Sequence, residues 1–284
     1  MKNPKISVVM AVYNEEKFVG KTIESILNQT FRDFEFIIVD DGSTDRTLKI
    51  LKKYAKKDSR IKILRNEKNL GLTKSLNKAL KVAKGEYIAR IDAGDLCDPK
   101  RLEKQANFLD KNSDVYIVGC YHHWINEKGK IIDSYKFPTS PEKIRNHIFG
   151  FGSIAAHPCL MIRKKLFDDL GFYDESFSTS MEYELYMRTI SNGFKISNIP
   201  EFLVSVMRRE KGISISKNKR IFQNMYRIRL RYLRTMFSIK NLFYTIISFL
   251  LSLMPGFLLR KIICSKLWSK KIRNVLISKN IFTF

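Results

Sequence analysis

An apolar stretch that ends in two closely spaced carboxylates constrains this chain most. Residues 87–91 have the predominantly apolar character of a buried strand, and Asp92 and Asp95 follow them, separated by two small residues. A strand covered on both faces gives a charge no access to water, so the aspartates are predicted at its carboxyl end, where ligands bind in open α/β sheets. Two carboxylates there suit Mg²⁺ or Mn²⁺, which share the rest of their shell with water and substrate phosphates. A solvated Asp-Gly turn is the alternative.

Strands and helices alternate along the first 120 residues. Near-continuous apolar runs mark the strands, and apolar residues at helical spacing lie between them. The predicted strands are 6–12, 36–39, 61–64, 87–91 and 115–120. This alternation predicts an α/β fold with a mostly parallel sheet and helices on both of its faces.

Three of these strands end in acidic or polar loops, at residues 13–16, 40–41 and 92–95. In a parallel sheet all three ends lie on one edge, so we expect them to converge in space. The alternative, that loops are simply polar, explains one such cluster better than three.

Beyond residue 124 the pattern is less regular. Residues 154–162 could form a strand that is interrupted by His157, and residues 181–185 open a helix. Glu182 would lie in the first turn of that helix, where the helix dipole favours a carboxylate. Capping alone is therefore a sufficient reading of Glu182 at this point.

The C-terminal segment carries most of the net charge of +24. From residue 201 onward the only acids are Glu201 and Glu210, against eighteen lysines and arginines. A basic helix is predicted over 220–236, and an uncharged, largely apolar run follows at 241–259, broken by Pro255 and Gly256. The run approaches the length of a membrane span, but the break favours a helical anchor on an anionic membrane surface, through residues 220–279.

Other readings of this segment remain open. A buried helical hairpin or a true membrane span would also accommodate the apolar run. The positive charge could instead serve a basic nucleic-acid-binding protein, but no nucleic-acid-binding module is recognisable, so no nucleic-acid partner is expected. The four cysteines show no paired spacing, which favours a reduced, cytoplasmic protein associated with the inner face of the membrane.

Several motifs together resemble the family 2 glycosyltransferases of the GT-A fold. The resemblance covers about residues 4–215 and leaves the C-terminal segment outside it. Its most specific parts, in this order, are residues 7–15, 38–45 and 89–95, supported by 99–105 and, more loosely, by 157–158, 171–175 and 182–185.

The resemblance implies an inverting transfer of sugar from a nucleotide-sugar donor, with UDP as the first expectation, to an acceptor hydroxyl on a glycan or lipid-linked molecule. It implies a divalent metal cofactor, Mn²⁺ or Mg²⁺. The nucleotide-sugar-binding residues that it implies are Ala11, Val12, Tyr13, Glu15, Asp41, Lys74 and Asp92, with Asp41 accepting from a base N–H and Lys74 directed at the phosphates.

The resemblance also assigns the other roles. Asp95 and Asp92 fall on the metal-binding motif, and Glu182 falls at the catalytic base. His157 and Arg208 are secondary candidates on the acceptor or phosphate side. The predicted organisation is a glycosyltransferase domain over 1–215, with a nucleotide-sugar half at 1–120 and an acceptor-side half at 121–215, and a membrane-associating helical tail at 216–284.

Two positions depart from the family pattern. Gly94 stands where the family commonly has a further aspartate, and Glu182 follows Met181 where the family commonly has Glu-Asp. A catalytically impaired GT-A scaffold and a nucleotidyltransferase-like enzyme therefore remain alternatives. A nucleotidyltransferase is disfavoured because no glycine-rich, lysine-bearing loop follows the first strand, and the Gly-x-Gly-x-x-Gly of a Rossmann dehydrogenase is absent there too.

Overall fold

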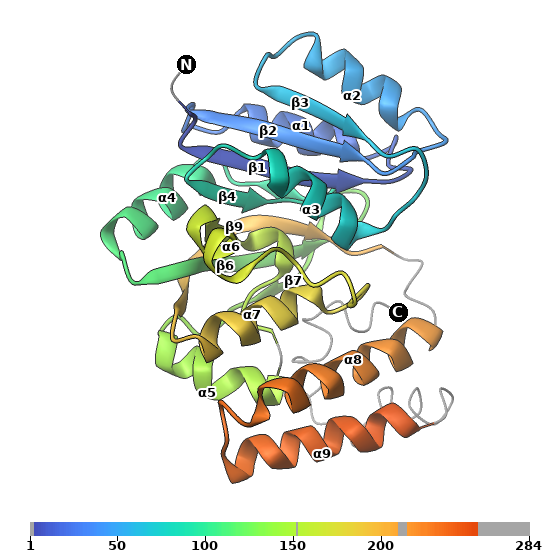
Figure 1. Cartoon of the computed structure of the whole chain (residues 1–284). Helices are drawn as coiled ribbons and strands as arrows, with labels where there is room; N and C mark the ends of the chain where they lie inside the picture. Colours follow the sequence, from blue (N-terminus) through green and yellow to red (C-terminus); the bar gives the residue numbers. More distant parts are fainter. Residues whose placement is uncertain (1–2, 152, 210–214, 255–284) are drawn as a thin grey trace.

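One sheet of nine strands runs through the part of the chain that the computed structural model describes, residues 3–151, 153–209 and 215–254. The strands lie in the order β3-β2-β1-β4-β8-β6-β9-β5, and β7 pairs with β6 (Figure 1). Their bounds are β1 Ile6–Val12, β2 Phe34–Asp40, β3 Ile61–Arg65, β4 Tyr87–Arg90, β5 Leu96–Cys97, β6 Val115–Ile125, β7 Ile131–Tyr135, β8 Met161–Arg163 and β9 Lys195–Met207.

Helices cover both faces of this sheet. In Figure 1, α3 lies in front of β1 and β2, and α1 lies behind them. The described helices are α1 Val19–Leu27, α2 Thr47–Ala55, α3 Leu72–Val82, α4 Arg101–Lys111, α5 Pro141–Phe151, α6 Lys164–Leu170, α7 Met181–Ser191, α8 Ile215–Leu233 and α9 Ile239–Leu253, with a 3₁₀ turn, η1, at His157–Cys159.

The first four long strands are parallel. β1 lies between β2 and β4, and β3 pairs with the outer side of β2. Every residue of β2 is buried, as expected for a strand that is covered on both faces. The predicted α/β fold with a mostly parallel sheet and helices on both faces is confirmed.

The second part of the sheet is less regular than the sequence predicts. Residues 154–160 are not a strand: His157 begins the 3₁₀ turn, and only Met161–Arg163 forms β8. β8 is antiparallel to both β4 and β6, which inserts it between the two parallel groups. The long β9 runs parallel to β6 and was not predicted. Strand β6 runs across the predicted boundary at residue 120 without a break. The division into a nucleotide-sugar half and an acceptor-side half therefore stays a prediction about function.

Two helices form the last described layer. α8 and α9 lie side by side at the lower end of the molecule, and α8 packs between α9 and α7 (Figure 1). α8 starts five residues before the predicted start of the basic helix, at Ile215. Within the described ranges, no helix is both long enough and apolar enough to cross a membrane. The predicted break at Pro255 and Gly256 lies outside the described residues.

Candidate functional site

The polar ends of β1, β2 and β4 converge as predicted. The three strands are parallel neighbours, so the loops that follow them leave the sheet at one edge. The backbone N–H of Asn14 donates to Ser43 Oγ (3.0 Å), and that of Glu15 donates to Thr47 Oγ1 (2.7 Å). The third loop is joined to the helix that follows the first loop, because the backbone N–H of Gly94 donates to Thr22 Oγ1 (2.8 Å) and that hydroxyl donates to the carbonyl of Asp95 (2.9 Å).

Asp95 is a buried carboxylate that is only half satisfied. Its side chain is 3% exposed, and its Oδ1 accepts a hydrogen bond from the backbone N–H of Met207 (2.8 Å). Its Oδ2 has no hydrogen-bond partner in the described part of the chain. Burial, and then the nearby charge of Asp92, raise the pKa of the Asp95 carboxyl well above its usual range.

Arg90 lies beneath the same two carboxylates. Its side chain is 2% exposed, and its Nη2 donates to Asp92 Oδ1. Nε and Nη1 of this guanidinium have no hydrogen-bond partner in the described ranges. From the other side, Arg101 Nη2 donates to the carbonyl oxygens of Arg90 (2.9 Å) and Leu160 (3.1 Å), which fixes the end of β4. Buried charged groups with unused hydrogen-bonding atoms mark a site that a ligand can complete.

Gly94 is required by the backbone between the two aspartates. Its φ is +102°, in the region that favours glycine. A Cβ on this residue would lie 2.4 Å from Cε of Met207. The Met207 side chain therefore fills the space that the aspartate expected from the family pattern would occupy.

Asp41 holds the loop before α3 rather than pointing away from the protein. Its Oδ1 accepts from Asn66 Nδ2 (2.7 Å) and from the backbone N–H of Leu70 (2.9 Å), and its Oδ2 accepts from the N–H of Gly71 (2.9 Å). The Asp41 carboxylate is buried with these partners. A base N–H could share its Oδ2, and the residue also builds the wall of the predicted nucleoside site.

The other predicted nucleotide-sugar residues line the end of β1 and the start of α3. Val12 is buried and its carbonyl accepts from the N–H of Asp41 (2.8 Å), whereas Ala11 is half-buried. Tyr13 is 42% exposed, and Lys74 is exposed on α3. Both side chains are therefore accessible from solvent.

Glu15 pairs with Arg209 instead of standing alone. Arg209 Nη2 donates to Glu15 Oε1 (2.5 Å), and Oε2 is buried without a partner in the described part of the chain. Burial raises the pKa of the Glu15 carboxyl, and the pairing with Arg209 opposes that rise. This pair closes the loop after β1 onto the segment after β9.

Glu182 is the second residue of α7 and lies half-buried near two tyrosines. Burial and then the negative charge of Glu182 raise the pKa of Tyr186, whose hydroxyl has no hydrogen-bond partner among described residues. Burial also raises the pKa of Tyr173. The positive charge of Arg90 opposes this rise, and the negative charges of Glu182 and Asp92 add to it. The charges of the predicted base and of one predicted metal ligand therefore both act on Tyr173.

His157 contacts Tyr173, whereas the backbone of Arg208 contacts β6. His157 Nε2 and the hydroxyl of Tyr173 form a hydrogen bond (2.9 Å). Burial, and then the positive charge of Arg90, lower the pKa of His157 well below its usual value. The backbone N–H of Arg208 donates to the carbonyl of Ile125 (2.8 Å), which anchors this residue to β6, and the next residue supplies the guanidinium that meets Glu15.

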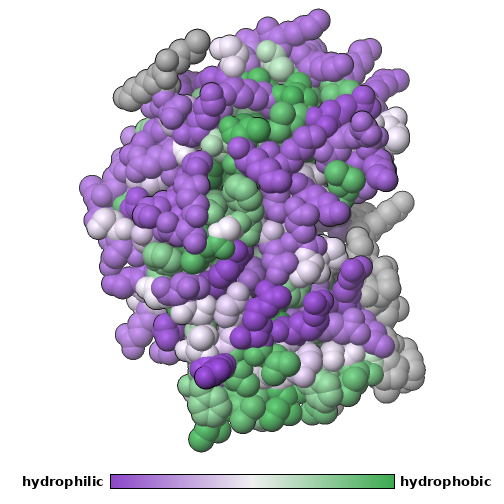
Figure 2. Space-filling model, in the orientation of Figure 1, coloured by the Kyte–Doolittle hydropathy of each residue, from purple (hydrophilic) through white to green (hydrophobic). Residues whose placement is uncertain are grey.

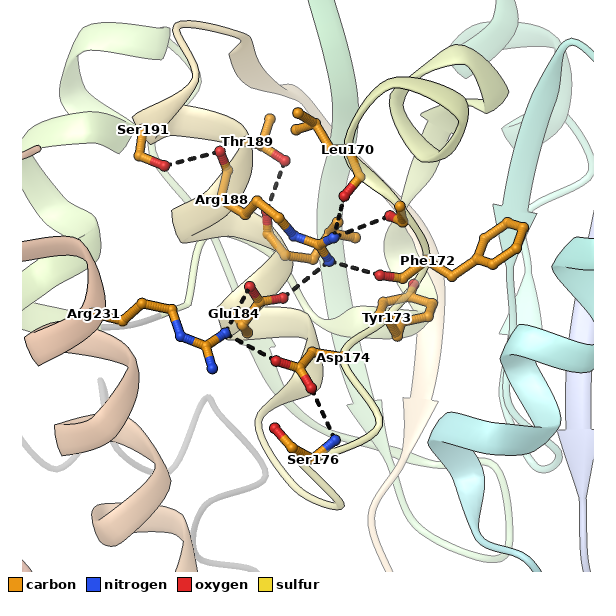
Figure 3. A network of polar contacts seen from close by, with 12 residues as sticks. Leu170, Phe172, Tyr173, Asp174, Ser176, Glu184, Arg188, Thr189, Ser191 and Arg231 are labelled. Carbon is orange, nitrogen blue, oxygen red and sulfur yellow. Dashed lines mark hydrogen bonds and ion pairs between the residues drawn. The ribbon is translucent and has the colours of Figure 1, made fainter.

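Glu184, one position beyond Tyr183, has a structural role that contrasts with that of Glu182. Its buried carboxylate accepts from Arg188 Nη2 (3.0 Å) and from the hydroxyl of Tyr232 in α8 (2.6 Å). Arg188 also donates to the backbone carbonyls of residues 170–172 (Figure 3). Arg231 in α8 adds an ion pair with Asp174 (2.9 Å). This network fixes α7 against α8 and the loop that carries Tyr173.

The chemistry of Asp92 and Asp95 fits a divalent cation. Asp92 and Asp95 carry like charges near one another, and Asp95 is buried with an unpartnered oxygen. A bound cation would reduce the repulsion between the two carboxylates. Among described residues, no group of three or more His, Cys, Asp or Glu could hold a metal by itself. Two carboxylates are nevertheless the usual protein share of a Mg²⁺ or Mn²⁺ site that borrows substrate phosphates.

Sequence reasoning missed several residues of the site. Arg90, Met207 and Arg209 were not predicted to take part, nor were Tyr173 and Tyr186. The sequence does contain a signal for Arg90. A positive charge at the end of a buried strand needs a counter-ion, and Asp92 follows two residues later. The contacts of Met207 and Arg209 depend on β9, whose pairing cannot be read from local pattern.

Known proteins with similar sequence or structure agree on one family. The family model described as "Glycosyl transferase family 2" matches residues 7–171. The uncharacterized glycosyltransferase MJ1057 of Methanocaldococcus jannaschii is 36% identical in an alignment of 278 residues, and the match covers 93% of this chain and 94% of that protein. The O-antigen biosynthesis glycosyltransferase WbnJ of Escherichia coli is 38% identical over 204 residues, covering 70% of this chain and 78% of WbnJ.

A solved structure shows the same architecture. The crystal structure of residues 1–349 of S. aureus TarS in complex with UDP superposes with a TM-score of 0.66 and 26% sequence identity. The match covers 81% of this chain and 65% of the crystallised fragment of TarS, so this chain spans slightly less than two thirds of that fragment.

Proposed function

The chain belongs to glycosyl transferase family 2 and is a glycosyltransferase, and on that premise we propose that it transfers a sugar from a UDP-sugar to an acceptor hydroxyl with inversion. The acceptor in this proposal is a growing surface polysaccharide or a glycolipid. Similarity to WbnJ, which is named for O-antigen biosynthesis, supports the acceptor class, and similarity to UDP-bound TarS supports the nucleotide.

The unpartnered Oδ2 of buried Asp95, beside Asp92 and Arg90, carries this proposal. A group that is buried with a charge and no partner costs stability, so it is expected where a ligand supplies the missing contact. The ligand that fits here is a cation with the diphosphate of the donor. When bound, the cation would stabilise the negative charge that develops on the leaving nucleoside diphosphate.

The residues of this chain divide the remaining work between the two sides of the site. Residues around Asp41 and Tyr13 would hold the nucleoside, and the unused Nε and Nη1 of Arg90 would donate to the donor beneath the carboxylates. Asp92 and Asp95 would hold the metal. These contacts orient the bond between the anomeric carbon and the diphosphate oxygen before the reaction.

Glu182 would act as the base. The acceptor O–H loses its proton to the Glu182 carboxylate while its oxygen forms a bond to the anomeric carbon. The bond from that carbon to the diphosphate oxygen breaks, and the electron pair leaves with the diphosphate. One displacement of this kind inverts the anomeric centre and needs only one base. The negative charges of Glu182 and Asp92 both act on Tyr173, which supports a role for Glu182 at the same site.

We place the reaction in the cytoplasm. All three cysteines in the described part of the chain, Cys97, Cys120 and Cys159, are free and buried. Free thiols that are not paired suit a reducing compartment.

A donor screen tests the proposal. Purified full-length protein is incubated with a panel of nucleotide sugars and Mn²⁺ or Mg²⁺, and release of nucleoside diphosphate is followed with and without EDTA. Turnover of one UDP-sugar that EDTA abolishes is the expected result. Turnover that is unchanged by EDTA would refute the metal assignment, and absence of both turnover and donor binding would leave the alternative of a catalytically impaired scaffold.

A further inference from the structure

The helix α9 buries polar residues and exposes apolar ones, which is the reverse of the usual arrangement on a protein surface in water. The residues that it buries are polar: Thr245, Ser248 and Ser252. Apart from Lys240, the residues that it exposes are large and apolar. Together with Phe237 just before the helix, they are Ile239, Leu242, Phe243, Ile246, Phe249, Leu250 and Leu253, between 38% and 82% exposed. Figure 2 shows these residues as a continuous hydrophobic surface at the lower end of the molecule. We call this set the α9 face.

The buried polar residues need neither water nor a partner on another element. Thr245 Oγ1 donates to the carbonyl of Asn241 (2.8 Å), Ser248 Oγ to that of Thr245 (2.7 Å), and Ser252 Oγ to that of Phe249 (2.7 Å). The small side chains let α9 approach α8 closely. Surface helices in water show the opposite arrangement, whereas helices in lipid pack through small residues and present large apolar ones outward.

The α9 face belongs to the fixed part of the fold. Arg229 of α8 is 4% exposed and donates through Nη1 to the carbonyl of Tyr244 (3.0 Å) and through Nε to the hydroxyl of Tyr183 (3.2 Å). A Cβ at Gly150 of α5 would lie 2.9 Å from the Tyr244 ring, so α5 and α9 are in close contact. The apolar surface is therefore held in one orientation relative to α7.

Exposed positive charge lies beside the α9 face, on α8 and at the start of α9. Lys219, Arg220, Arg227, Arg234 and Lys240 are exposed on α8 and at the start of α9, and residues 215–254 contain no acid. A cavity of about 300 Å³ opens beside α8, and its wall includes Arg220, Gln223 and Arg227 of α8, Ser252 of α9 and Ser176 of the loop before α7. A second copy of this chain would bring like charges together at such a surface, whereas an anionic lipid surface would neutralise them.

We infer that the α9 face lies in the interfacial layer of a lipid bilayer that carries anionic headgroups, and that the cavity at Arg220 and Arg227 receives a headgroup phosphate. Apolar side chains would enter the boundary between headgroups and acyl chains, and the bases of α8 would meet the phosphates. This inference goes beyond the transfer reaction and stands whether or not the proposed donor is right.

Vesicle flotation of the full-length protein tests the inference. The probes are vesicles of phosphatidylcholine alone and vesicles that also contain phosphatidylglycerol. The double variant Ile246→Glu/Leu250→Glu, at 49% and 53% exposed positions of the α9 face, is expected to bind the anionic vesicles at least about tenfold more weakly than the wild type. The double variant Arg220→Gln/Arg227→Gln should lose the preference for anionic vesicles and keep the weaker binding to neutral ones.

A matched control separates the α9 face from apolar exposure in general. Ile131→Glu/Ile132→Glu changes two residues of β7 that are 52% and 47% exposed, and it should bind vesicles as the wild type does. Thermal denaturation of each variant verifies that it is folded. Equal vesicle binding by the wild type and the α9-face variant would overturn the inference, as would absence of vesicle binding by the wild type. Sedimentation that shows a dimer lost only in the α9-face variant would assign the face to a second copy and would overturn it too.

Discussion

The backbone N–H of Met207 donates to Oδ1 of Asp95 over 2.8 Å, across 112 residues of sequence. This bond fastens the carboxylate at the end of β4 to the end of β9, and the Met207 side chain fills the space beside Gly94. One oxygen of Asp95 is thereby fixed, and the other is left buried and unpartnered among described residues. The site is thus assembled from both parts of the sheet.

Asp95→Asn should abolish turnover without lowering thermal stability. Asparagine has the same shape and can still accept from Met207, and it removes a buried charge that lies beside Asp92. We expect turnover to fall by about 100-fold or more, with an unchanged or higher Tm in metal-free buffer. Asp98→Asn, an exposed charge three residues further on, is the control and should change neither quantity. A clear fall in Tm for Asp95→Asn would show that the carboxylate is structural.

Glu182→Gln and Glu184→Gln should separate chemistry from structure within one helix. Glu182→Gln removes the proposed base, so kcat should fall by about 100-fold or more while donor affinity and Tm stay near wild type. Glu184→Gln weakens the buried pairing with Arg188 and Tyr232 and should cost about 2–3 kcal/mol of unfolding free energy. Single-turnover kinetics and chemical denaturation measure the two effects. The assignment fails if Glu182→Gln retains kcat.

Restoring the family's usual aspartate at residue 94 should harm the protein. At a φ of +102° a side chain is strained, and its Cβ would meet Met207, so Gly94→Asp should cost about 1–2 kcal/mol and should not raise turnover. Adding Met207→Ala should relieve the contact but not the backbone strain. Denaturation of the single and double variants checks this, with Met207→Ala alone as reference. A more active and equally stable Gly94→Asp would contradict it.

Arg101 should prove essential for stability. The guanidinium is fully buried and donates to the carbonyls of Arg90 and Leu160 and to Gln105 Oε1 (3.0 Å). Arg101→Met would remove the hydrogen bonds to the Arg90 carbonyl and to Gln105 Oε1, and the Leu160 carbonyl would keep only the bond from the Arg90 N–H (3.1 Å), so the change should cost about 3 kcal/mol or more. Lys104→Met on the outer side of the same helix, where the lysine pairs with Glu201 at the surface, should change the denaturation midpoint little. Equal midpoints for the two variants would disprove the role of Arg101.

His122 should make the fold sensitive to acid. Burial, and to a lesser extent the charge of His123, lower the pKa of His122 to about 4, and neither ring nitrogen has a hydrogen-bond partner in the described ranges. Below about pH 6.5 the His122 imidazole binds a proton in the unfolded chain, whereas in the folded chain it stays neutral until about pH 4. Stability should therefore fall as the pH drops from about 6.5 through about 4, by up to about 3 kcal/mol from this residue.

His122→Phe isolates that contribution. The ring stacks near Tyr135 and Phe137, so phenylalanine suits the site. The variant should match the wild type in Tm near neutral pH and exceed it below about pH 5. Parallel pH profiles of Tm for the two proteins would rule out the acid sensitivity assigned to His122, while other groups such as His157 contribute equally to both profiles.

The first half of the fold was predicted correctly from the sequence. Strands β1 to β4 are short, largely apolar runs separated by helices, and that pattern has one common solution, a parallel sheet. The convergence of the polar strand ends follows from the same rule. The second half could not be read, because β8 has only three residues and β9 pairs with β6 across a long interval, so local periodicity says little about either.

The site shows the same division. Asp92 and Asp95 were predicted because a charge must lie at the end of a buried strand. The pairing of Glu15 with Arg209, in contrast, joins residues separated by 194 positions and depends on where β9 ends. Asp41 was predicted to face the nucleoside, and the structure adds a second role, since its oxygens hold the loop before α3.

The most direct measurement is calorimetric titration of the wild type with the nucleoside diphosphate of the selected donor, with and without Mn²⁺. The account predicts that Mn²⁺ tightens binding by about tenfold or more in the wild type and in Asp98→Asn, and that this coupling is absent in Asp95→Asn. Equal coupling in all three proteins would show that Asp95 does not hold the metal and would contradict the account.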